Sequence, residues 1–160
     1  MNFLKLMCYA IIVLAISGCS EKKSVESYIT EAQTLISKKK NSEAIISLKN
    51  AIKLDFKNAT ARFLLGQLYL NEGYPEKAIK ELERANKLKF DVDKVLPLLA
   101  RAYILTESDN DVLDLASQEK LLSSTNTHFF PYKTLAAIRV GDMKLAQDTV
   151  DLAFLVSSND

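Results

Sequence analysis

Small and apolar residues recur along this chain at an interval of 34 residues. Ala44 and Ala78 are separated by this interval, and so are Leu48 and Leu82. Three further pairs have the same separation: Ala51 and Ala85, Phe56 and Phe90, and Tyr69 and Tyr103. Within one interval the apolar positions are three or four residues apart, which is the spacing of one face of an α-helix. A fixed period of this length is typical of stacked helical units, and an ordinary helical bundle is the alternative.

The period divides the chain from residue 25 onward into four units, each predicted to be a helix–turn–helix. Their bounds lie near 25–58, 59–92, 93–126 and 127–160. The sequence therefore predicts an all-α solenoid of about four repeats and about eight helices. The pattern weakens toward the end of the chain. Val112 and Glu119 replace alanines in the third unit, and Lys133 and Thr134 fit the fourth unit poorly.

The second unit carries the pattern most fully. Gly66 and Ala78 are small residues at the expected contact between its two helices, so the two backbones can approach closely. Three large residues are expected to fill the space around them: Leu65, Tyr69 and Leu82. Gly73 is predicted to adopt the left-handed conformation that ends the first helix, and Pro75 suits the first turn of the second.

Capping residues are predicted in other units as well. In the first unit, Asn41 or Ser42 would cap the second helix. In the third unit, Pro97 is expected in the first turn of its helix, where a missing N–H costs least. Residues 109–111 are expected to cap the following helix, which would run to about Leu122.

The spacing of these large and small residues resembles the tetratricopeptide repeat (TPR), a helix–turn–helix unit of 34 residues. Two positions depart from it. Arg62 stands where the repeat usually carries tryptophan, and Phe90 stands where it usually ends in proline. The resemblance implies a right-handed solenoid whose first helices line a concave groove that binds other proteins.

Seven residues are candidates for lining that groove, because they occupy positions that usually point into it. They are Gln33, Phe63, Gln67, Leu70, Asn71, Arg101 and Ile104. Such a surface suits an extended peptide or an amphipathic helix, with Gln67, Asn71 and Arg101 holding its backbone or a carboxylate. The alternative is that Phe63, Leu70 and Ile104 pack between neighbouring first helices.

The chain begins with a positive charge followed by an apolar segment. Lys5 precedes residues 6–16, which are too few to span a bilayer but match the apolar region of a secretory signal. Residues 16–19, Ile-Ser-Gly-Cys, resemble the bacterial lipobox. That resemblance implies removal of residues 1–18, acylation of Cys19 and a tether over residues 19–24, with two or three acyl chains giving stable anchoring. An ordinary signal peptide or a short buried helix is the alternative.

Ser20 follows the lipobox cysteine where aspartate would mark retention at the inner membrane. By resemblance to Gram-negative lipoproteins, this implies the periplasmic face of the outer membrane. Charge adds no other partner, because 21 Lys and Arg balance 20 Asp and Glu. We therefore expect no binding to nucleic acid.

Residues for catalysis are scarce. His128 is the only histidine, so one chain cannot form a two-histidine metal site. Glu81 and Glu83 cannot share a helical face at their spacing, and no Gly-rich phosphate loop occurs. We expect no enzyme activity, no metal and no cofactor.

Residues 62–73 and 95–102 resemble the beginning of the TPR lipoproteins of the PEP-CTERM and exosortase system, and the similarity covers roughly residues 42–115. It implies an envelope adaptor in exopolysaccharide export or in sorting of PEP-CTERM proteins. A pilotin-like chaperone for a secretin and a direct polysaccharide or peptidoglycan binder are the alternatives. Members of that family carry more repeats, and no polar capping helix follows the last one expected here. A partner or a second copy, forming a homo-oligomer, is therefore expected to cover the apolar end.

Overall fold

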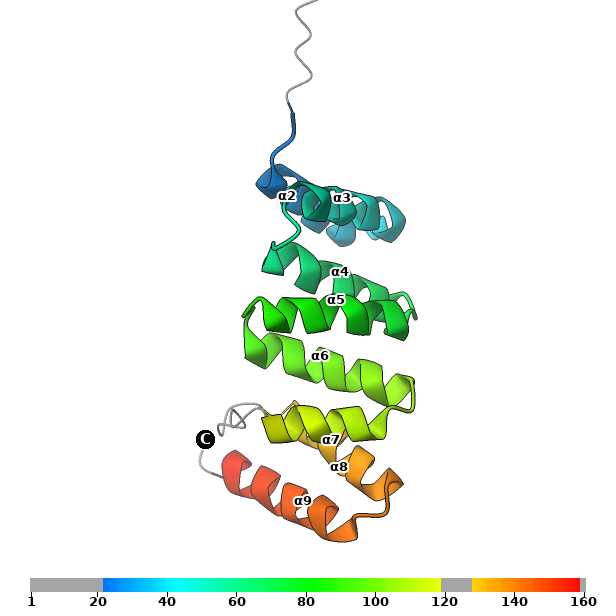
Figure 1. Ribbon diagram of the computed structural model, residues 1–160, viewed down its shortest axis with the longest axis vertical. Coiled ribbons are helices and arrows are strands. Elements are labelled where there is room, and N and C mark those ends of the chain that lie inside the picture. The colour runs from blue at the N-terminus through cyan, green and yellow to red at the C-terminus, as the bar shows by residue number, and fades with distance from the viewer. Residues whose placement is uncertain (1–21, 119–127, 159–160) are drawn as a thin grey trace, which may run out of the picture.

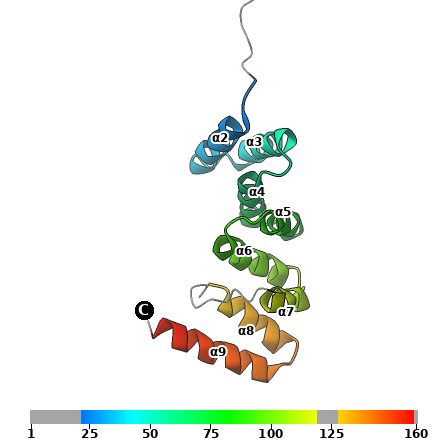
Figure 2. The ribbon, with the colours of Figure 1, turned by 60° about the vertical axis from the view of Figure 1, so that its left-hand side comes forward.

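The computed structural model describes residues 22–118 and 128–158. This part of the chain holds eight α-helices and no strand, as the sequence predicted. The helices are α2 (Val25–Ser37), α3 (Asn41–Leu54), α4 (Ala59–Asn71), α5 (Pro75–Lys87), α6 (Val92–Leu105), α7 (Asp109–Gln118), α8 (Phe130–Arg139) and α9 (Met143–Ser157). Helical hairpins stack along one axis from α2 and α3 at one end to α8 and α9 at the other (Figure 1), and a second view shows the same order (Figure 2).

The turns inside the hairpins repeat with the period of the sequence. One residue in each turn has a positive φ: Lys39 at 59°, Gly73 at 78°, Glu107 at 56° and Gly141 at 83°. Successive members of this set are 34 residues apart. The residue after each of them donates its N–H to a carbonyl five positions back, as Tyr74 does to Tyr69 at 2.9 Å. This bond closes the helix end, so one left-handed residue reverses the chain in every unit. The described residues therefore contain four helix–turn–helix hairpins, as the predicted fold requires.

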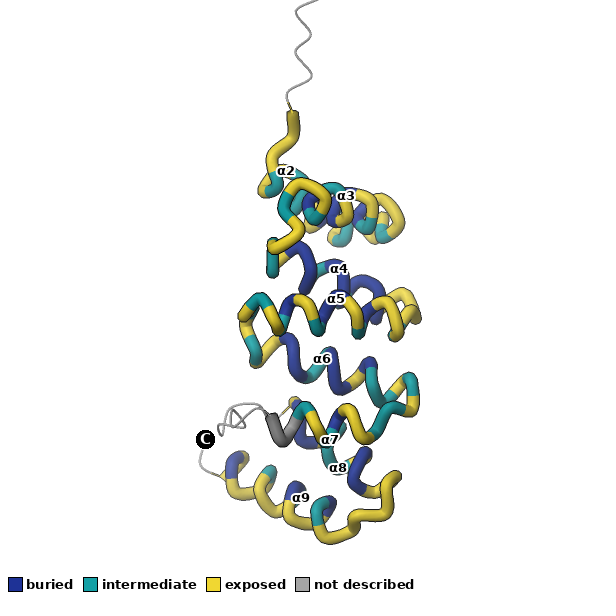
Figure 3. The backbone as a smooth tube through the Cα atoms, viewed as in Figure 1, coloured by how far each residue is buried: buried dark blue, intermediate teal, exposed yellow. Residues whose placement is uncertain are grey.

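Close packing between α4 and α5 depends on Gly66. A Cβ at this position would lie 2.7 Å from Leu82 Cγ and 3.2 Å from the Leu82 backbone nitrogen. Leu82 and the flanking Ala78 are fully buried. The predicted role of the small residues in this unit is thus confirmed, and the same helix faces form the dark-blue core in Figure 3.

Helices α6, α7 and α8 share a separate cluster of buried side chains. Its buried members are Leu96, Ala100, Val112, Phe129 and Ala136. In α8 the fully buried small residues are Ala136 and Ala137, whereas Lys133 and Thr134 are half-buried. The fourth unit fits the repeat pattern poorly because its buried small residues come later in α8 than the pattern places them.

Two local predictions were wrong. Pro97 lies inside α6 and not in its first turn. The reason is that α6 begins earlier than expected, at Val92, where the Asp91 side chain accepts a hydrogen bond from the Asp93 N–H at 3.2 Å. Neither Asn41 nor Ser42 caps α3, because the helix begins at Asn41 and its cap position makes no side-chain bond.

The start of the described chain is fixed by a cap. Ser24 accepts a hydrogen bond from the Ser27 N–H at 3.1 Å and so begins α2. None of the helices in residues 22–118 and 128–158 is both long and apolar enough to cross a membrane. Cys19, Glu119 and Leu122 lie outside the described residues.

Candidate functional site

The candidate site is a cavity of about 350 Å³ between α4 and α6, the first helices of the second and third units. Its lining consists of Phe63, Gln67, Asp93, Lys94, Pro97, Leu98 and His128. The Phe63 ring stacks on that of Phe90, with ring centroids 4.5 Å apart and planes 19° from parallel. This stack gives the cavity a rigid apolar floor.

The predicted groove residues divide into three groups by exposure. Gln33, Asn71 and Arg101 are exposed, and Gln67 and Ile104 are half-buried. Phe63 and Leu70 are buried, with 8% and 3% of their surface exposed. Both belong to the buried hydrophobic core, although Phe63 also reaches the cavity. The cavity brings together only Phe63 and Gln67 from the predicted set.

Several residues of the cavity were missed from the sequence. Lys94 carries a positive charge at its edge and makes an ion pair with Asp91 at 2.8 Å. His128 comes from the start of the fourth unit and lies at the same cavity. An apolar floor with an amide, an ammonium, a carboxylate and an imidazole around it suits a peptide, which offers apolar side chains and backbone hydrogen-bonding groups. No sequence signal near His128 pointed to this placement.

Arg62, which departs from the TPR pattern, forms a buried ion pair across the hairpin. Its Nη1 donates to Glu81 Oε2 on α5 at 2.5 Å, and its Nη2 donates to the Phe56 carbonyl at 3.0 Å. Only 7% of Arg62 and 8% of Glu81 is exposed. Among the described residues none accepts a hydrogen bond from Arg62 Nε. The pair therefore joins α4 to α5 in the place where the repeat usually has a large aromatic ring.

Glu83 has a different partner from Glu81, as expected from their spacing. The Tyr103 hydroxyl on α6 donates to Glu83 Oε1 at 2.8 Å. Burial of the ring and the nearby carboxylate of Glu83 raise the pKa of Tyr103. Tyr103 thus remains a neutral donor that links α6 to α5. Residues 22–118 and 128–158 contain no cluster of three or more His, Cys, Asp or Glu that could hold a metal ion.

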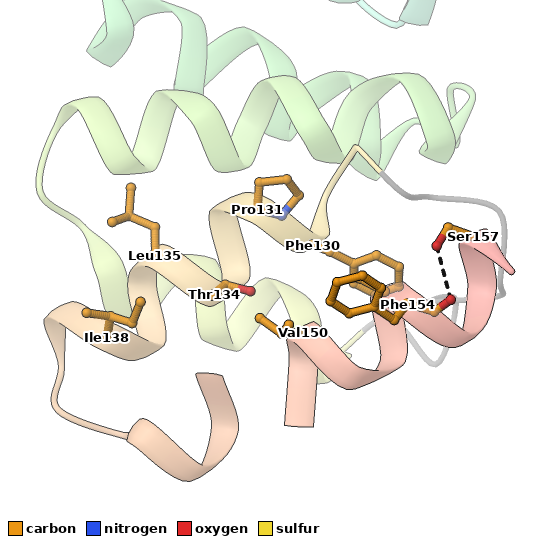
Figure 4. A pocket seen from close by; sticks show the side chains of 9 residues that line it. Phe130, Pro131, Thr134, Leu135, Ile138, Val150, Phe154 and Ser157 are labelled. Carbon is orange, nitrogen blue, oxygen red and sulfur yellow. Dashed lines mark hydrogen bonds between the residues drawn. The ribbon is translucent and has the colours of Figure 1, made fainter. Parts of the chain in front are cut away.

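A second, more apolar cavity lies in the last hairpin (Figure 4). It has a volume of about 520 Å³ between α8 and α9. Side chains that line it include Phe130, Thr134, Leu135, Ile138, Val150 and Phe154. Ser157 also lines it, but its hydroxyl is occupied, donating to the Phe154 carbonyl at 3.0 Å.

Comparison with protein families identifies repeats between residues 32 and 92. A "TPR repeat" model matches residues 32–73, and a "Tetratricopeptide repeat" model matches residues 59–92. A comparison with curated proteins found no match. Residues 32–92 therefore carry tetratricopeptide repeats, and the chain folds as a TPR-type solenoid.

Solved structures share this fold at low sequence identity. MamA is 20% identical with a TM-score of 0.74, over 94% of this chain and 85% of its own. YrrB, described as a TPR protein with an unusual peptide-binding site, is 19% identical with a TM-score of 0.73, over 88% of this chain and 72% of its own. Pseudomonas aeruginosa pilF is 16% identical with a TM-score of 0.64, over 85% of this chain and 62% of its own. TPR-repeat proteins are generally non-enzymatic scaffolds that bind proteins or peptides.

Proposed function

We propose that this chain is a membrane-anchored adaptor of the bacterial cell envelope that binds another protein through the groove along α2, α4 and α6. The observation that carries the proposal is the cavity between α4 and α6, which combines the Phe63 floor with the polar groups of Gln67, Lys94 and His128. This mixture recognises a peptide segment, because apolar contact supplies affinity while the few polar groups fix its orientation.

The bound segment is an extended peptide or one face of an amphipathic helix. An apolar side chain of the partner enters over Phe63, and Gln67 at the same cavity bonds its backbone. Asn71 and Arg101 are exposed on α4 and α6, outside the lining of the cavity. They extend the contact along the groove and favour a partner with an acidic group.

Changing Gln67 to arginine tests the groove. The larger, charged side chain would occupy the cavity and place a cation over its apolar floor, so we expect at least about a tenfold loss of affinity for the partner, or about 1.4 kcal/mol. The measurement is quantitative co-purification of the partner from envelope extracts. Lys80→Glu, on the exposed face of α5, is the control and should retain binding. Equal capture by the Gln67 and Lys80 variants would contradict the groove proposal.

The membrane tether is a proposal that rests on the lipobox resemblance of residues 16–19. Two or more acyl chains on Cys19 would hold the protein at the membrane, since each buried methylene contributes about 0.8 kcal/mol. We expect a Cys19→Ala form to leave the membrane fraction and to lose activity in the cell, as measured by fractionation and complementation. Full complementation by a soluble Cys19→Ala protein would refute the tether.

The pathway is proposed from the resemblance of residues 62–73 and 95–102 to exosortase-system lipoproteins. The partner is then a component of exopolysaccharide export or of PEP-CTERM protein sorting, at the periplasmic face of the outer membrane. Recovery of a secretin tail on the groove would instead indicate a pilotin-like chaperone. Retention on polysaccharide or peptidoglycan columns, with no protein bound, would indicate a glycan binder.

A further inference from the structure

Exposed apolar side chains are concentrated in the last hairpin. Seven of the twelve large hydrophobic residues that are exposed in the described chain lie between Leu135 and Leu155. Phe154 is 71% exposed and Ile138 is 49% exposed, and both line the cavity between α8 and α9. A patch of this kind on a folded protein marks an interaction surface, because burying it is favourable.

Comparison of the fourth unit with the second indicates which kind of structural element fits this surface. Leu135 and Ile138 occupy the positions in the fourth unit that Gln67 and Leu70 occupy in the second. In the second unit α6 lies next to Gln67, with which its residues line a cavity, and Leu70 is only 3% exposed. The contact face of α6 includes Val95, Leu99 and Ala102, all at most 1% exposed and part of the same core as Leu70. The equivalent surface of the fourth unit is therefore shaped for one more α-helix with apolar residues at this spacing.

Helix α9 carries such a stripe on its own exposed side. Met143, Val150 and Phe154 are spaced by seven and four residues, which places them on one helical face. Met143 is 64% exposed, and Val150 and Phe154 border the cavity. The Phe154 ring, 71% exposed, lines the cavity together with Phe130 (Figure 4), so the hairpin presents an apolar hollow and an exposed aromatic ring on one surface, as a self-complementary interface requires.

Charge also permits two copies of this hairpin to meet. Residues 130–157 contain three basic residues, Lys133, Arg139 and Lys144, and three acidic ones, Asp142, Asp148 and Asp151. The surface therefore carries no net charge that would repel its own copy.

Stacking head to tail on the opposite end of the solenoid is disfavoured. Every exposed residue of α2 is polar: Glu26, Ser27, Thr30, Gln33, Thr34 and Ser37. Covering that face with the apolar hairpin would remove these groups from water without giving them partners. The favourable contact is between two copies of the α8–α9 face.

We propose that two copies of this chain pair through α8 and α9 across a two-fold axis, with α9 of each copy covering the cavity of the other. Phe154 of each copy enters the partner's cavity beside Ile138. This contact is separate from the groove along α2, α4 and α6, so the dimer would present two grooves. Failure of the pairing leaves the groove proposal intact.

Phe154→Glu tests the pairing in the full chain, extracted in mild detergent. A carboxylate at this position would have to enter an apolar cavity, so we expect the wild-type dimer to become monomeric, with at least a hundredfold weaker association in sedimentation. Phe56→Glu is the matched control, because Phe56 is 68% exposed on the turn between α3 and α4 and should leave the dimer unchanged. Circular dichroism checks that both variants remain helical.

A photo-crosslinking residue at position 154 identifies what covers the cavity in cells. We expect an adduct of twice the chain mass, with the crosslink mapped to α8 or α9 of a second copy. An adduct to a different protein would overturn the proposal, as would a wild-type chain that sediments as a monomer at concentrations on the order of 10 µM.

Discussion

Replacing Arg62 with alanine is expected to lower the free energy of unfolding by about 3–5 kcal/mol. The Arg62 guanidinium lies 2.5 Å from Glu81 Oε2, and both side chains are nearly inaccessible to solvent. Removing it would leave the buried Glu81 carboxylate with only the partly exposed Arg84, 3.8 Å away, while the Phe56 carbonyl would lose a donor. Urea denaturation followed by circular dichroism measures the change.

Two further variants separate this explanation from a general loss of packing. Arg84 lies 3.8 Å from the same carboxylate but is 47% exposed, so Arg84→Ala should cost no more than about 1 kcal/mol. The double change Arg62→Met with Glu81→Leu should recover most of the stability, because it removes both charges and the unpartnered Nε together. Equal destabilisation by the single and double changes would contradict the ion-pair account.

Leu82→Ala is expected to have the second large effect, lowering the free energy of unfolding by about 2–5 kcal/mol. Leu82 is fully buried between α4 and α5, and its side chain fills the space opposite Gly66. Truncation would remove apolar contacts and leave a cavity that the close-packed hairpin cannot fully close. The midpoint of thermal or urea unfolding reports the loss.

The effect of changing Gly66 is expected to depend on the side chain at position 82. In the native protein Gly66→Ala places a methyl group 2.7 Å from Leu82 Cγ, and the resulting overpacking is expected to exceed the gain of about 1 kcal/mol from helix propensity. In the Leu82→Ala background the contact with Cγ is gone and only the approach of 3.2 Å to the backbone nitrogen of residue 82 remains, so Gly66→Ala should cost less than in the native protein. A double-mutant cycle measures this coupling. Additive effects would show that α4 and α5 are not held as close together as the Gly66–Leu82 contact requires.

The repeat and its turns were predictable because they depend on local sequence. A positive φ at Gly73 follows from the glycine itself, and the period then places the equivalent turns at Lys39 and Glu107. The contact of Gly66 with Leu82 was also predictable, since both belong to one hairpin. Local periodicity therefore determines each unit and most of the fold.

The composition of the candidate site depends on contacts between units, which the period does not specify. Phe63 and Leu70 were candidates for an open groove, but Phe90 stacks on Phe63, and Leu70 is buried in the hydrophobic core. His128 reaches the cavity from residues far along the chain. Arg62 looked like a lost consensus residue, and only the hairpin geometry shows that Glu81 compensates for it.

Pro97 illustrates how a single cap changes a local prediction. The Asp91 side chain begins α6 early enough to place the proline within the helix. A proline inside a helix removes one hydrogen bond, and its ring crowds the preceding turn. The same residue lines the candidate cavity, so the early start of α6 also shapes the proposed binding surface.

Site-specific photo-crosslinking in intact cells tests the adaptor account most directly, with the crosslinking residue placed either at Gln67 in the groove or at Lys80 on the exposed face of α5. The account predicts a discrete adduct to one other envelope protein from position 67 and none from position 80. Adducts of the same protein from both positions, or from position 80 alone, would contradict binding through the groove.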